Sequence, residues 1–225
     1  MLLRRNFQKK LTHINLMNTE NLNKEKNGFR IFLKKNLKLL ITLCLVIILI
    51  GIFFIWLDYS EKSKRTKSSE SFIESKILLS EKNYSKSLEI LENIIKMKDN
   101  TYSPLSLFLI LDQNLEKDNK VVLEYFNDVL SIRNLENEDK NLLRLKKAIF
   151  ISNTVNEKEM LDLLNPIINS DSVWKTQSLK FLGDYYFSLK QFKKAENYYS
   201  TLLNYEDSTI DLKEIKRKIK SIQNG

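Results

Sequence analysis

The sequence contains little glycine, proline, histidine or cysteine, and each shortage excludes a class of structure or chemistry. Only four of 225 residues are glycine and two are proline, too few for the many turns of a β-rich domain. The only histidine, His13, and the only cysteine, Cys44, precede residue 58. Residues 58–225 therefore contain no Ser-His or Cys-His catalytic pair, no histidine metal site and no disulfide.

The carboxylates that remain do not indicate catalysis. Pairs such as Glu89 with Glu92 have the spacing of solvated helix faces. Ser172 and Lys175 match S-x-x-K, but the companion motifs of the enzymes that use it are missing. No glycine-rich phosphate loop is present. The sequence predicts a protein that is not an enzyme and that holds no cofactor and no metal.

One apolar run divides the chain. Residues 39–57, LLITLCLVIILIGIFFIWL, are nineteen residues without a charge. At about 1.5 Å per residue, a helix of this length matches a hydrocarbon core of roughly 30 Å, so a single transmembrane helix is expected. A cleaved signal peptide is the alternative, but the run exceeds the usual apolar core of roughly 7–15 residues and no small-x-small cleavage site follows it.

The positive charge is concentrated before this run. The net charge is +9, of which residues 1–38 carry +8, whereas residues 58–225 carry +1. A basic tail before the first span predicts a cytoplasmic N-terminus and an exported C-terminal domain, and it should adhere to anionic lipid. The nearly neutral domain argues against nucleic-acid binding. The true start is either Met1 or Met17.

Apolar residues after the span recur at helical spacing, as in Leu212, Ile215 and Ile219. We expect eight or nine amphipathic helices, separated by polar breaks near residues 99–101, 117–119, 134–139, 153–156 and 170–171. Ser103 before Pro104 predicts one helix start and Ser208 with Asp211 predicts another, while Asp171 or Ser172 is expected to cap a third. The expected regions are a basic tail (1–38), a transmembrane helix (39–57), a juxtamembrane stalk or linker (58–70) and a helical domain (71–224).

Residues 179–203, LKFLGDYYFSLKQFKKAENYYSTLL, resemble the tetratricopeptide repeat, which packs two antiparallel helices. Small residues are expected where the helices cross, with large apolar residues beside them. The repeat-packing positions are Leu182, Gly183, Tyr186, Phe192, Ala195 and Tyr199. Residues 71–95 resemble a degenerate copy with Ser75 and Ser87 at the small positions. Residues 103–133 and 138–169 keep the helix-turn-helix spacing of the repeat but not its signature residues. The fold class is therefore all-α, a transmembrane helix followed by a tetratricopeptide-like α-solenoid of antiparallel helix pairs; an ordinary helical bundle is the alternative.

The whole arrangement resembles the ancillary SecYEG translocon subunit family of bacterial inner membranes. The resemblance covers residues 30–205 and rests on the order of tail, span, stalk and repeats, and on the motif at 174–205. It implies a single-pass inner-membrane protein with a periplasmic repeat domain. The implied partners are the Sec translocon or periplasmic chaperones during protein export.

Stacked helix pairs form a concave surface lined by the first helix of each pair, and this surface is the expected binding site. Its candidate residues are Phe72, Lys76, Leu79, Lys180, Asp184 and Phe187. Packing of Phe187 and Leu79 against a neighbouring repeat is an equal alternative. A basic face at residues 213–220 is a weaker candidate for acidic lipid or an acidic partner.

The predicted function is a membrane-anchored, non-enzymatic protein-interaction module. Two alternatives remain open: a scaffold for envelope or cell-division complexes, and a receptor or sensor whose domain faces the cytoplasm. The sequence leaves open the identity of the partner, the oligomeric state and whether the groove binds peptide.

Overall fold

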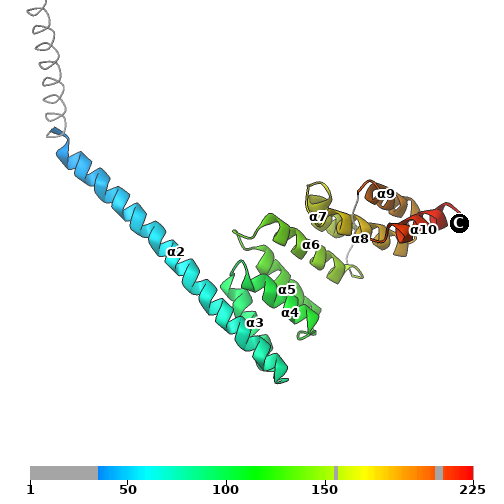
Figure 1. The fold of residues 1–225 in the computed structure, drawn as a ribbon, viewed down its shortest axis with the longest axis horizontal. Helices are drawn as coiled ribbons and strands as arrows, with labels where there is room; N and C mark the ends of the chain where they lie inside the picture. Colours follow the sequence, from blue (N-terminus) through cyan, green and yellow to red (C-terminus); the bar gives the residue numbers. More distant parts are fainter. Residues whose placement is uncertain (1–34, 155–156, 206–209, 225) are drawn as a thin grey trace, which may run out of the picture. The chain divides into compact units, whose positions relative to one another are not determined.

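The computed structural model describes residues 35–154, 157–205 and 210–224. Within these ranges the chain is helical and has no strand (Figure 1), which confirms the all-α prediction. The chain divides into two compact units, residues 1–62 and 63–225. The basic tail predicted at 1–38 and the start at Met1 or Met17 lie almost wholly outside the described residues.

The first helix, α2 (Leu37–Ser80), contains the whole apolar run. It is long and apolar enough to cross a membrane, by length and composition. Its large apolar side chains are exposed, for example Leu49 at 65% and Ile55 at 71%, as lipid contact would require. Residues 58–70, for which the sequence left stalk and linker open, are helical throughout; no Gly or Pro interrupts them.

The second unit consists of the end of α2 and of shorter helices joined by short connections. Each helix from α3 to α10 packs on a neighbour in the chain, and the breaks fall close to the polar segments predicted for them. The helices are α3 (Tyr84–Met97), α4 (Tyr102–Asp112), α5 (Asn119–Leu130), α6 (Asn137–Ile151), α7 (Glu157–Ile168), α8 (Lys175–Ser188), α9 (Phe192–Leu202) and α10 (Leu212–Gln223).

The start predicted at Ser103–Pro104 is wrong. Helix α4 begins at Tyr102, because the Asp99 carboxylate accepts hydrogen bonds from the backbone N–H of Thr101 (2.9 Å) and Tyr102 (2.7 Å). The Ser103 hydroxyl instead donates to the carbonyl of Ile94 (2.8 Å) and ties α4 to α3. Pro104 lies in the first turn, where its missing N–H has no helical partner to lose.

The other two helix starts also differ in detail from expectation. Asp211 itself caps α10, since its carboxylate accepts from the N–H groups of Lys213 (2.9 Å) and Glu214 (3.2 Å); Ser208 lies outside the described residues. Before α8, the Ser172 hydroxyl oxygen accepts from the N–H of Trp174 (3.2 Å). Ser172 rather than Asp171 therefore organises that turn.

Two clusters of buried side chains hold the second unit together. The N-terminal core joins α3, α4 and α5 around fully buried Phe126, and the C-terminal core joins α6 to α10 around fully buried Tyr199. Helix α6 contributes to both cores, through Leu143 to the first and Ala148 to the second. Each cluster buries more than ten apolar side chains, and removal of each such side chain from water contributes roughly 1.5–3 kcal/mol to folding.

Small residues lie where paired helices approach closely. Gly183 on α8 is buried, and a Cβ built there would overlap the ring of Tyr199 on α9. Ala195 on α9 is fully buried. In the first pair, Ser75 and Ser87 are fully buried and the Ser87 hydroxyl donates to the carbonyl of Ser75 (3.0 Å), so a hydroxyl satisfies a backbone oxygen at the crossing of α2 and α3.

Candidate functional site

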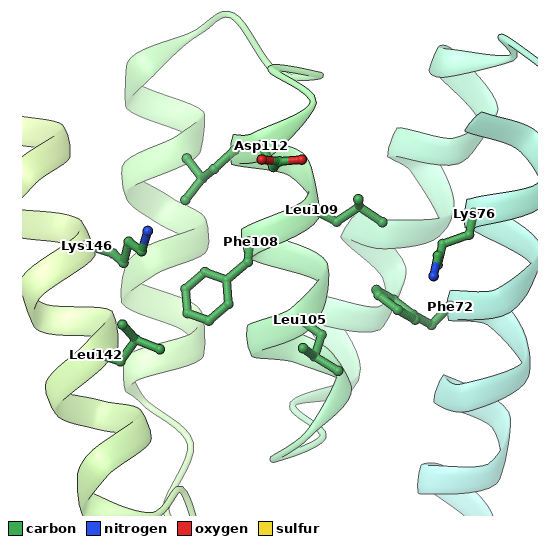
Figure 2. A pocket seen from close by; sticks show the side chains of 9 residues that line it. Phe72, Lys76, Leu105, Phe108, Leu109, Asp112, Leu142 and Lys146 are labelled. Atoms are coloured by element: carbon green, nitrogen blue, oxygen red, sulfur yellow. The ribbon is translucent and has the colours of Figure 1, made fainter. Parts of the chain in front are cut away.

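A hollow of about 600 Å³ lies across α2, α4 and α6 in the second unit. Figure 2 shows the lining side chains on three helices. The three helices run in the same direction, as the residue numbers increase the same way along each of them. Most of the lining is leucine and phenylalanine. The lining residues are Phe72, Lys76, Leu105, Phe108, Leu109, Leu111, Asp112, Leu142 and Lys146.

Helix α4 supplies most of the hollow because it is apolar on two sides. Leu107 and Ile110 are buried in the N-terminal core. Leu105, Phe108 and Leu109, at spacings of three and four, form a second stripe that lines the hollow, and Leu105 remains 41% exposed. Phe108 and Leu109 also pack partly against the N-terminal core, but a helix needs only one apolar stripe to join a core, and the second stripe is left only half-covered.

Charged side chains border the apolar lining. Lys76 on α2 and Lys146 on α6 lie on either side of Asp112 on α4 (Figure 2). Both ammonium groups are exposed, and among the described residues no ion pair joins either of them to a carboxylate. The Asp112 carboxylate accepts from the side-chain amide of Gln113 (2.7 Å). The rim therefore offers two ammonium groups with unused hydrogen-bonding capacity.

A smaller hollow of about 300 Å³ adjoins the first. It extends from α4 and α6 to the start of α5, and Leu111 and Lys146 line both hollows. Ile149, which is 46% exposed, adds an apolar wall. The apolar surface between α4 and α6 is thus continuous over both.

The structure divides the predicted site residues between two places. Phe72 and Lys76 line the large hollow, and the Phe72 ring also packs on Tyr102 at 5.8 Å between centroids. Leu79 is half-buried and is not among the lining residues. Lys180, Asp184 and Phe187 all lie on α8, away from the lining.

Asp184 connects three helices of the C-terminal core. One carboxylate oxygen accepts from the Tyr199 hydroxyl of α9 and the Lys218 ammonium of α10, both at 2.7 Å, and the other pairs with Lys180 at 2.7 Å. Burial opposes ionisation of Asp184, but the hydrogen bonds from Lys180, Lys218 and Tyr199 outweigh it and lower the pKa of the carboxyl. Asp184 and Lys180 are therefore engaged within the chain.

Phe187 packs edge-on against Phe192, with ring centroids 5.6 Å apart. It belongs to the half-buried rim of the C-terminal core, while Phe192 remains 43% exposed. This contact favours the packing interpretation of Phe187 that the sequence left open.

Two further tyrosine–carboxylate pairs join neighbouring helices. The Tyr186 hydroxyl donates to Glu157 (2.9 Å), which also receives Lys194 (2.6 Å), and the hydrogen bonds from Lys194 and then Tyr186 lower the pKa of Glu157. The Tyr125 hydroxyl donates to a carboxylate oxygen of Glu92. Burial, followed by these hydrogen bonds, raises the pKa of both tyrosines. These pairs hold helices together, and no cluster of metal-ligating side chains occurs in the part of the chain that the structure describes.

No protein-family model, no curated protein and no solved structure matches the chain. Its described residues define an all-α protein with one helix able to cross a membrane and, in the second unit, an apolar hollow bordered by lysines.

Most of the residues that line this hollow were not predicted from the sequence. The unpredicted lining residues include Leu105, Phe108, Leu109, Leu142 and Lys146. One signal was available: residues 104–111, PLSLFLIL, are apolar around the whole helix, more than one buried face requires.

Proposed function

We propose that this protein is a membrane-anchored, non-enzymatic protein-binding module, with a tetratricopeptide-like α-solenoid attached to a transmembrane helix. The observation that carries the proposal is the apolar hollow lined by α2, α4 and α6. In an α-solenoid, alternate helices line one concave face, and these three helices alternate with α3 and α5 along the chain.

The occupant we propose is a segment of another protein that carries both apolar and acidic side chains. Phe108, Leu105 and Leu142 would receive apolar side chains. Lys76 and Lys146 would receive carboxylates, because these ammonium groups have no ion-pair partner among the described residues. Asp112 between them would disfavour a carboxylate at the centre of the bound segment.

Anchoring makes a modest groove sufficient. Confinement to one membrane raises the effective concentration of a membrane-bound partner, so weak binding gains occupancy without added contacts. The basic tail before the span favours a cytoplasmic N-terminus and a domain on the other side of the membrane. The family resemblance implies that this membrane is a bacterial inner membrane and that the domain is periplasmic. The Sec translocon and periplasmic chaperones are the partners we propose from the family resemblance, and membrane lipid contacts the span and the tail.

Site-specific crosslinking in intact membranes tests the groove. A photoreactive residue at Leu105 or Leu142 should capture the partner, and Phe108→Asp should reduce this capture at least several-fold by placing a charge on the apolar lining. Leu189→Asp is the matched control, since Leu189 is a leucine 48% exposed outside the lining. Equal capture from the Phe108→Asp and Leu189→Asp proteins would contradict the proposed groove.

The captured protein decides among the partner classes. Translocon subunits or chaperones support the export role, whereas division or envelope proteins without translocon subunits support the scaffold alternative. Fusion of alkaline phosphatase or of a fluorescent protein to the C-terminus tests on which side of the membrane the domain lies. An active phosphatase supports a periplasmic domain. An inactive phosphatase together with a fluorescent second fusion supports the receptor or sensor alternative.

A further inference from the structure

The charged side chains of the large hollow recur at the same helical position on three helices. Each lies one turn beyond an apolar lining residue of its own helix, as Figure 2 shows. The three pairs are Phe72 with Lys76 on α2, Phe108 with Asp112 on α4, and Leu142 with Lys146 on α6. The hollow therefore presents two rows that cross the helices, an apolar row and a charged row in the order positive, negative, positive.

Other charged side chains near the hollow do not change this order. Glu116 and Lys117 line the smaller hollow beside Lys146 and carry opposite charges. At 100° per residue, Arg65 on α2 and Asp139 on α6 lie on the hollow side of their helices, but before the apolar row and outside the lining. A ligand in the hollow therefore meets the three charges of the charged row first.

The volume of the hollow favours an extended chain. Phe72 of α2 packs on Tyr102 of α4, and Leu143 brings α6 into the N-terminal core with α4. Packed helices lie about 8–10 Å apart, so three of them span roughly 20 Å. A volume of about 600 Å³ over that length has a cross-section of roughly 30 Å², less than half that of a helix about 10 Å wide. An extended chain needs a width of only about 5 Å.

An extended chain also matches the spacing of the rows. A polyproline-II segment rises about 3.1 Å per residue with three residues per turn, so every third side chain points the same way at intervals of about 9 Å. This interval is close to the separation of packed helices. One set of side chains can therefore meet the apolar row while the adjacent set meets the charged row.

We propose that the hollow selects an extended segment in which a basic side chain lies between two acidic ones, at intervals of three residues and each beside an apolar residue. The acidic side chains pair with Lys76 and Lys146. The basic side chain pairs with Asp112, which sets the specificity. This inference rests on the proposed function, because it names the class of segment that the same hollow takes. The charge order is the same in both chain directions.

Two peptides of equal composition test the charge order. Both have leucine at the first, fourth and seventh positions and proline, which favours the polyproline-II form, at the third, sixth and ninth. The matched peptide has aspartate, lysine and aspartate at the second, fifth and eighth positions, and the permuted peptide has lysine, aspartate and aspartate. Their net charges are equal, so general attraction to the basic tail does not favour either.

Fluorescence anisotropy measures binding to the full chain in nanodiscs of neutral lipid. The native protein should bind the matched peptide at least five-fold more tightly than the permuted one. The preference is limited because the pairs are exposed to solvent, and it should shrink in about 1 M salt.

Charge exchange within the charged row should transfer the preference. Asp112→Lys leaves three lysines and should bind both peptides equally, whereas Lys76→Asp with Asp112→Lys should invert the preference. Asp112 is the last residue of α4, where lysine favours a helix, so the variant should fold. The control is Lys158→Asp with Asp162→Lys, which exchanges the charges of an exposed pair on α7 (3.1 Å) and should leave the preference unchanged.

Three results would overturn the proposal: equal binding of the two peptides to the native protein, a preference that the exchange does not invert, or no binding of either peptide. Tighter binding of a helical peptide with the same residues seven positions apart would overturn the extended form. Partner capture from Leu105 reports on the proposed function separately. Capture without a peptide preference removes the charge order and leaves the groove, whereas failure of both capture and binding removes both.

Discussion

The two terminal helices of the second unit expose opposite kinds of side chain to solvent. At the C-terminal end, α10 buries Ile215 in the core and turns a basic stripe to solvent, formed by Lys213, Lys216, Arg217 and Lys220. At the N-terminal end, α2 turns Ile73 and Ile77 outward. The C-terminal end therefore exposes charged groups that water solvates well, whereas the N-terminal end exposes apolar side chains whose burial by a second surface would be favourable.

The ends also differ in how they are attached. Helix α10 is tied by an ionic network, in which Lys218 bridges Asp184 of α8 and Glu214 of its own helix, both at 2.7 Å. The end of α2 is tied through small residues, with the Ser68 hydroxyl 3.5 Å from the Met97 sulfur and Ser87 bonded to the Ser75 carbonyl. The C-terminal attachment should depend on pH and the N-terminal attachment should not.

The largest effect is expected at the closest helix crossing. Gly183→Leu should destabilise the fold by about 1–3 kcal/mol or more, because the fully buried Tyr199 ring occupies the space of any Cβ. Thermal unfolding of the detergent-solubilised protein measures the loss. Gly51→Ala is the control, since nothing lies within 4 Å of a Cβ at Gly51; equal melting temperatures for the two variants would contradict the crossing.

Removal of the Asp184 carboxylate should loosen α10. Asp184→Ala leaves the Tyr199 hydroxyl without its acceptor, which should cost about 1–3 kcal/mol and speed amide hydrogen exchange in α10. Asp184→Asn keeps an acceptor and should cost less. The control is Asp162→Asn in the exposed Lys158–Asp162 pair (3.1 Å), with an expected change below about 0.5 kcal/mol. Unchanged exchange in α10 would contradict the attachment.

The contribution of Asp184 should disappear in acid. Its pKa is lowered in the folded protein, so the unfolded chain binds the proton more readily and protonation favours unfolding. The stabilisation is complete above the unfolded pKa of about 4 and is lost as pH falls through the lower folded pKa. The difference in unfolding free energy between the native protein and Asp184→Asn should therefore shrink below about pH 4; a constant difference from pH 7 to pH 2 would refute the ionic attachment.

The smallest effect is expected at Ile73 and Ile77, the two exposed isoleucines near the end of α2. Ile73→Ser with Ile77→Ser should change the unfolding free energy by less than about 0.5 kcal/mol in dilute detergent solution, because both side chains are already exposed. Leu78→Ala, one residue further along α2 and 9% exposed, should cost about 2 kcal/mol or more. Similar losses for the double variant and Leu78→Ala, measured by denaturant unfolding, would show that the isoleucines belong to the core.

Prediction from sequence succeeded where one local rule decides the outcome. The shortage of Gly and Pro and the helical spacing of apolar residues predicted an all-α chain, and the polar breaks located most helix ends within a few residues. Local rules were insufficient where several neighbouring residues could each cap the same helix start. Asp99 rather than Ser103 starts α4, because Ser103 finds a buried acceptor on α3 that no local pattern reveals.

The candidate site was only partly predictable for a similar reason. Phe72 and Lys76 were expected at a binding face and do line the hollow. Asp184 on α8 was expected there too, but its carboxylate accepts hydrogen bonds from Tyr199 and Lys218 of the same chain. Whether a charged side chain serves a partner or a neighbouring helix depends on what lies across from it, and sequence spacing does not contain that information.

The sequence by itself determined that the described chain is all-α and contains one helix able to cross a membrane. A long uncharged apolar run could satisfy its backbone in lipid only as a helix, and amphipathic spacing favours helices that pack on one side for the remainder. Only the tertiary structure decided which apolar surfaces of these helices remain exposed. They are the hollow lined by Phe108 and the surface of α2 that carries Ile73 and Ile77. The reason is physical, because burial is a property of the neighbours that a side chain meets and those neighbours come from distant parts of the chain.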